Sequence, residues 1–121
     1  MKWLVVLACG LGLLSGSAGA AEPILLQAHT AGELAALCAA EPGSPGADAK
    51  INYCHGFAQG AVDTRLHGAG DRKPFCFPVP APTRTATMHD FVTWVRATPA
   101  NRDLPALDGL FKFLGERYPC K

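Results

Sequence analysis

Five cysteines in a chain of 121 residues constrain this protein more tightly than any other feature of its sequence. A chain of this length has room for one hydrophobic core of ordinary size, so the cysteines belong to a single domain or to a segment outside it. An odd number leaves one sulfur without an intramolecular partner if the others form disulfides. The first question is therefore which cysteine lies outside the folded domain.

The first twenty residues have the plan of a targeting segment. Met1 and Lys2 precede an apolar run, and small residues then lead to an Ala18-Gly19-Ala20 ending. This pattern is typical of a secretory signal peptide that is cleaved after Ala20. The alternative is an N-terminal membrane anchor, which is disfavoured because the apolar run is shorter than the ~20 residues that span a bilayer. The predicted domains are thus a signal peptide (1–20) and a mature domain (21–121).

Cleavage after Ala20 makes the cysteine count even. It removes Cys9 and leaves Cys38, Cys54, Cys76 and Cys120. Four cysteines in a small exported domain predict two disulfides, formed in the periplasm or outside the cell. Cleavage also removes Lys2, which leaves ten basic and ten acidic residues and a net charge of zero. This balance argues against nucleic acid or an anionic membrane as the main partner, and nothing else in the chain looks transmembrane.

Two helices are predicted in the first half of the mature domain. Thr30, followed three residues later by Glu33, forms a capping-box pattern in which each side chain satisfies a free amide of the other residue. The helix behind this box is expected to end by Pro42. Asp48 is the expected N-cap of a second helix over roughly residues 49–67, whose apolar residues recur on one face.

A proline-rich loop and two further helices are predicted in the second half. Four prolines within residues 74–82 exclude a regular helix there. A third helix is expected to begin near Thr85 or Thr87 and to end before Pro99. Asp103 is the expected N-cap of a fourth helix with apolar residues at helical spacing. The predicted fold class is therefore all-α, a small four-helix bundle stapled by two disulfides.

Three disulfide pairings are possible, and the helix order favours one of them. If the helices alternate in direction, the end of the first helix meets the start of the second, which places Cys38 beside Cys54. The loop before the third helix then meets the end of the fourth, which places Cys76 beside Cys120. From loop-closure entropy, such bridges stabilise the fold by roughly 3 and 4 kcal/mol.

A second face of the second helix carries small and polar residues. Gly56, Gly60 and Asp63 share this face, roughly opposite the apolar one. Each glycine costs an isolated helix ~1 kcal/mol relative to alanine. A groove that admits another backbone, from the same chain or another, would offset this cost. The alternative is that both glycines are tolerated on a solvated face.

The sequence offers little to build an active site. Cys54 and His55 are adjacent, but consecutive side chains on a helix diverge by ~100° and do not face each other. A nucleophilic cysteine also needs a free thiolate, whereas Cys54 is expected to be bridged. The four histidines are dispersed without the i, i+4 spacing of a zinc helix, and no C-x-x-C occurs. We expect no enzyme activity, no catalytic residue, no cofactor and no metal.

The proline-rich loop is a candidate partner-binding segment. Phe75 and Phe77 flank Cys76, so both rings point to the same side if the segment is extended. One or both rings could face solvent or a partner, and the alternative is that both pack over the base of the loop. A loop stiffened by proline loses little entropy on binding, which suits an inhibitor that inserts a loop into a cleft.

The cysteines and their neighbours follow a spacing that resembles a known family. The matching positions are Cys38; Cys54, Gly56, Phe57, Gly60 and Asp63; Phe75, Cys76 and Pro78; Thr98 and Pro99; and Tyr118, Pro119 and Cys120. As a set they resemble the Rap/Tai family of type VI secretion immunity proteins, over about Thr30 to Cys120. The resemblance implies a small, helical periplasmic protein, commonly a homodimer, that binds and inhibits a peptidoglycan amidase effector.

On this resemblance, the matched positions are expected to form the scaffold of the domain. They comprise the two bridges together with Gly56, Gly60, Asp63 and Pro78. We expect a periplasmic homodimer that inhibits a secreted cell-wall amidase without catalysis. The alternative is a periplasmic stress or chaperone-like helical protein that binds unfolded clients through apolar surface exposed on a trigger such as acid. A mere four histidines and a neutral charge disfavour a strong pH switch of this kind.

Overall fold

A computed structural model describes Gly16, Gly19 and residues 23–121, so the predicted signal peptide lies almost entirely outside the described residues. Among the described residues there is no β-strand beyond an isolated bridge between Thr30 and Pro105. The helices are α1 (Ala31–Cys38), α2 (Ala47–Ala69), α3 (Arg84–Ala97), α4 (Pro99–Arg102) and α5 (Ala106–Arg117). The predicted all-α fold is confirmed, with four principal helices and one extra turn, α4.

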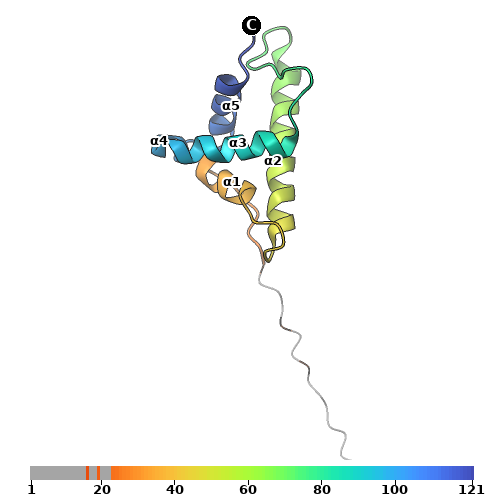
Figure 1. Cartoon of the computed structure of the whole chain (residues 1–121), viewed down its shortest axis with the longest axis vertical. Helices are drawn as coiled ribbons and strands as arrows, with labels where there is room; N and C mark the ends of the chain where they lie inside the picture. Colours follow the sequence, from red (N-terminus) through yellow and green to blue (C-terminus); the bar gives the residue numbers. More distant parts are fainter. Residues whose placement is uncertain (1–15, 17–18, 20–22) are drawn as a thin grey trace, which may run out of the picture.

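The helices cross one another at steep angles. In Figure 1, α2 stands as a long column and α3 lies across it, with α1 on one side of α3 and α5 on the other. The eight-residue α1 contacts each of the other four helices. The chain segment between α2 and α3 lies at the same end of the molecule as the C-terminus (Figure 1). This arrangement brings the proline-rich loop beside the end of the chain.

Aromatic rings from α3 and α5 form the centre of the core. Phe91 and Phe113 are fully buried and meet edge to face, with ring centroids 5.6 Å apart. Trp94 packs against Phe113 at 5.9 Å and donates its indole N–H to Glu116 at 2.7 Å, so its polar atom is satisfied. The predicted apolar stripe of the third helix is buried as expected, at Met88, Phe91, Val92 and Val95.

The predicted capping box at the start of α1 is present. The Glu33 amide donates to Thr30 Oγ1 at 3.2 Å, and the Thr30 amide donates to Glu33 Oε2 at 3.2 Å. The His29 amide donates to the same carboxylate oxygen at 2.7 Å. These backbone donors favour the ionised carboxylate and lower the pKa of Glu33 from its ordinary value. The Ala31 amide donates to Leu104 O at 2.8 Å, which ties α1 to the segment before α5.

The predicted N-cap of the second helix is wrong. The helix begins at Ala47, after Gly46, which adopts a left-handed conformation with φ of 74°. Asp48 therefore lies within the first turn, where its charge still faces the positive end of the helix dipole. A side chain at position 46 would be strained by this φ and would also meet Ile24, whose Cδ1 lies 2.5 Å from an ideal Cβ.

The predicted N-cap of the last principal helix is also wrong, whereas the third helix begins within one residue of its predicted start. Asp103 ends α4 and does not cap α5, which begins at Ala106 after Pro105. The Ala106 amide donates to His29 O at 2.9 Å, so a tertiary contact replaces a side-chain cap. The third helix begins one residue before Thr85 and is capped by Thr83, which accepts from the Ala86 amide at 3.1 Å.

The predicted disulfide pairing is confirmed. Cys38 at the end of α1 is bonded to Cys54 on α2, with 5.1 Å between their Cα atoms. Cys76 in the loop is bonded to Cys120 at the end of the chain, with 4.9 Å between their Cα atoms. The first bridge fixes α1 against α2, and the second fixes the loop against the C-terminus.

Candidate functional site

The proline loop, residues 74–83, is fixed at its base to the C-terminal segment. The Cys76–Cys120 disulfide joins the two segments covalently. Beside it, the Cys76 amide donates to Tyr118 O at 2.8 Å. The Phe77 ring packs against the Tyr118 ring with centroids 5.0 Å apart. The base of the loop is therefore held rigidly against the C-terminal segment.

The two loop phenylalanines serve mainly as anchors. Phe75 is 1% exposed and stacks on Phe111 of α5, with ring centroids 6.3 Å apart. It is therefore not available to a partner, and the alternative in which both rings pack over the loop base describes the structure. Phe77 is half-buried between Phe75 and Tyr118 and keeps some accessible surface. Phe75 is buried and Phe77 is half-buried because both rings cover the apolar surface of α5.

The tip of the loop presents a single aliphatic side chain. Val79 is 99% exposed and lies between Pro78 and Pro80, both of which are also exposed. The Val79–Pro80 peptide bond is cis. At its far end the loop runs into Thr83, the N-cap of α3. Val79 was not predicted as a contact residue, although the flanking prolines exclude a regular helix and so mark an irregular segment in which a valine can be exposed.

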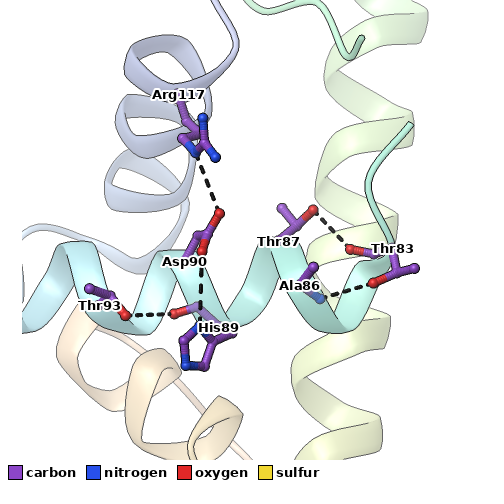
Figure 2. A network of polar contacts seen from close by, with 7 residues as sticks. All are labelled: Thr83, Ala86, Thr87, His89, Asp90, Thr93 and Arg117. Atoms are coloured by element: carbon purple, nitrogen blue, oxygen red, sulfur yellow. Dashed lines mark hydrogen bonds and ion pairs between the residues drawn. The ribbon is translucent and has the colours of Figure 1, made fainter. Parts of the chain in front are cut away.

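A network of polar contacts lies along α3 beside the loop (Figure 2). Arg117 Nε donates to Asp90 Oδ2 at 3.4 Å, and His89 Nδ1 lies 3.9 Å from the other carboxylate oxygen. These side chains are exposed, so the ion pair between Arg117 and Asp90 contributes little to stability. Asp90 and Arg117 also line an open groove of about 810 Å³ that runs beneath Pro78 and Pro80. The groove thus joins an apolar loop to one acid and two bases, because Lys121 lines it as well.

The small-residue face of α2 is open to solvent in this structure. Gly56, Gly60 and Asp63 are all exposed, and an ideal Cβ on either glycine meets nothing within 4 Å. No backbone among the described residues therefore packs against this face. The two glycines either lie on a solvated face or contact a second chain. Asp63 accepts a hydrogen bond from Gln59 Nε2 at 2.9 Å on the same helix. Pro78, the remaining predicted scaffold residue, lies in the exposed part of the loop.

The residues tested for catalysis do not form a reactive site. Cys54 is 0% exposed and bridged to Cys38, as expected, so it has no free thiol beside His55. No group of three or more metal-ligating side chains occurs in the part of the chain that the structure describes. None of the helices in that part is both long and apolar enough to cross a membrane.

The fold and its bridges define a small, all-α, disulfide-stapled domain that carries a rigid, exposed loop. A family model of the Rap1a immunity proteins matches residues 30–120, which include all five helices and both disulfides. The chain therefore belongs to the Rap1a immunity protein family, as its resemblance to the Rap/Tai proteins predicted. Searches of curated proteins and of solved structures returned no match.

Proposed function

We propose that this protein binds and inhibits a secreted peptidoglycan amidase in the periplasm, without catalysis of its own. The observation that carries this proposal is the family match over residues 30–120, because immunity proteins act by binding a cognate effector. The two disulfides support an extracytoplasmic location, since oxidising compartments form and maintain such bonds. The expected signal peptide would deliver the chain to that compartment as a mature domain of residues 21–121.

The proline loop is the element best suited to contact the amidase. Its base is held by a disulfide and by the Phe77–Tyr118 contact, so little conformational entropy is lost when the loop is bound. Its tip offers an aliphatic side chain that is 99% exposed at Val79. Burial of a whole valine side chain contributes roughly 1.5–3 kcal/mol, which is enough for an anchor at the centre of an interface.

The groove beneath the loop adds charged contacts to this apolar tip. Asp90 and Arg117 line it, and each is at least 40% exposed, so both can pair with groups on a partner. Rim charges of this kind mainly set specificity and association rate. The proposed interface is therefore an apolar, proline-stiffened loop flanked by one acid and two bases, the second base being Lys121.

A direct experiment uses the protein encoded beside this gene. If that neighbour is an amidase, adding the purified mature chain to it should stop peptidoglycan hydrolysis at one subunit of inhibitor per enzyme. Hydrolysis that continues at full rate with excess mature chain contradicts the proposal. If the chain instead suppresses aggregation of an unrelated unfolded client at low pH, the chaperone-like alternative is favoured.

We also propose that the protein is a homodimer. The long α2 supports this, because only Ala47 and Cys54 of its 23 residues are buried within one chain. Sedimentation equilibrium of the mature chain should give twice the monomer mass. A monomer mass at micromolar concentrations contradicts the dimer but leaves the inhibition proposal intact.

A further inference from the structure

A cavity of about 170 Å³ lies among α2, the proline loop, α3 and α5. Its floor is apolar, because Met88, Leu110 and Leu114 line it and are at most 4% exposed. Ala58 and Val62 of α2 form one wall. The volume is similar to that of an engineered cavity of ~150 Å³ that binds benzene. The space is therefore large enough for the apolar part of a small molecule.

The cavity persists because small side chains face it from two elements. Ala58 on α2 and Ala81 in the loop contribute only methyl groups to the lining. Because α3 crosses α2 steeply (Figure 1), the helices diverge on either side of their crossing point. The Cys76–Cys120 bridge holds the loop at its base and limits how far the loop can collapse into the space. The cavity is thus a consequence of the helix crossing angle, the small residues and the Cys76–Cys120 disulfide.

The polar part of the lining comes from the first turn of α3 and from α2. Arg84, His55, Gln59 and Thr87 contribute it; the Thr87 hydroxyl donates to Thr83 O, whereas Arg84 and Gln59 are exposed, which places them at the opening. The ion pairs in the described part of the chain do not include Arg84, so its guanidinium has no acidic partner there. Asp63, the acid next to this rim, accepts from Gln59 and is not part of the lining.

We propose that this cavity binds a small amphiphilic carboxylate, a short aliphatic or aryl-substituted acid. The apolar portion of the ligand occupies the floor, and its carboxylate faces Arg84, with His55 as a second donor. An apolar pocket with a few convergent polar groups is the usual form of a small-molecule site. Arginine is suited to the head group because its planar guanidinium binds carboxylates through two parallel hydrogen bonds. The proposal does not depend on the amidase.

The test is a titration of the isotope-labelled mature chain with phenylacetate and with hexanoate, followed by NMR. Saturable shifts should concentrate at the cavity, in Ala58, Val62, Met88 and Leu110. Phenylacetamide has the same shape without the charge, and it should bind at least tenfold more weakly. Absence of saturable binding by both acids overturns the proposal, and so does equal affinity for phenylacetate and its amide.

Two variants and one control variant separate the carboxylate site from general surface binding. Arg84→Gln should weaken phenylacetate binding about tenfold, whereas Arg96→Gln, an exposed arginine in the last turn of the same helix, should not change it. Ala58→Leu should fill the cavity and abolish binding of both acids. Because Arg84 is exposed, its substitution leaves the fold intact and keeps the test valid even if Ala58→Leu is unstable. Equal losses in the Arg84 and Arg96 variants contradict the assigned site.

Discussion

At the scale of single residues, the start of α1 depends on Thr30. Its hydroxyl accepts from the Glu33 amide at 3.2 Å, and Thr30→Ala leaves that donor without its side-chain partner. We expect this variant to lose about 1 kcal/mol of unfolding free energy, the usual cost of removing a threonine N-cap. Urea denaturation measures it. Thr85→Ala, at an exposed position in the first turn of α3, is the matched control and should change stability by less than ~0.5 kcal/mol.

The carboxylate of Glu33 makes part of the stability depend on pH. The His29 and Thr30 amides hold the pKa of Glu33 below its ordinary value in the folded state. A lowered folded pKa contributes stability at neutral pH that is lost as the pH falls through that pKa. The stability difference between the wild type and Glu33→Gln should therefore be largest at neutral pH and shrink on acidification. Urea midpoints measured from pH 7 to pH 3 check this, and a constant difference contradicts it.

Two helical glycines should respond in opposite directions to alanine. An ideal Cβ on Gly109 lies 2.5 Å from Ala31 Cβ, so Gly109→Ala must push α5 away from α1. We expect a loss of roughly 1–3 kcal/mol from this overpacking. Gly56→Ala meets nothing within 4 Å and should gain up to about 1 kcal/mol from helix propensity. Thermal denaturation of both variants, at concentrations at which the protein is monomeric, checks the signs, and destabilisation of the monomer by Gly56→Ala contradicts the expected gain.

At the scale of elements, the two disulfides differ in the length of chain that each one closes. Cys76–Cys120 closes a separation of 44 residues and Cys38–Cys54 one of 16. Loop-closure entropy predicts that replacing each pair by serine costs about 4 and about 3 kcal/mol, respectively. Urea denaturation of the two double variants measures these losses. A larger loss for the shorter bridge contradicts the entropic account and points to the packing of buried Cys54.

Much of the fold follows from sequence patterns, and the exceptions share a cause. Thr30 and Glu33 were recognisable because a capping box is local, and the apolar stripe of α3 follows from helical periodicity. Asp48 and Asp103 do not cap the helices that follow them, because the helix starts depend on Gly46 and on the contact between Ala106 and His29. A backbone conformation and a long-range hydrogen bond leave no local pattern of side chains.

The candidate site was predicted in part. The loop itself followed from its prolines, and its anchoring followed from the cysteines. Phe75 was offered as a contact residue but is buried, because the chain brings Phe111 of α5 against it from 36 positions away. The spacing of residues along the sequence does not show that Phe75 and Phe111 come into contact. The cavity beneath the loop depends on the crossing of α2 and α3 and was likewise invisible in the sequence.

At the scale of the whole molecule, the core is concentrated away from much of α2. The buried side chains come mainly from α1, α3 and α5, together with Phe75 of the loop. One flank of α2 borders the proposed carboxylate cavity, and another borders an open groove that includes Gly56, Gly60 and Phe57. The molecule thus joins a rigid core to a loop and a helix whose surfaces remain accessible. This division suits a protein that acts by binding.

Inhibition by the loop is tested most directly by titrating the proposed amidase partner with the mature chain and with two matched variants. Val79→Asp places a charge at the loop tip, and Leu25→Asp alters a 71% exposed leucine whose neighbour Ile24 lies at Gly46, before the start of α2, whereas the loop follows the other end of that helix. We expect complete inhibition at one subunit per enzyme by the wild type and by Leu25→Asp, and at least tenfold weaker inhibition by Val79→Asp. Failure of the wild-type chain to inhibit, or equal inhibition by both variants, would contradict this expectation.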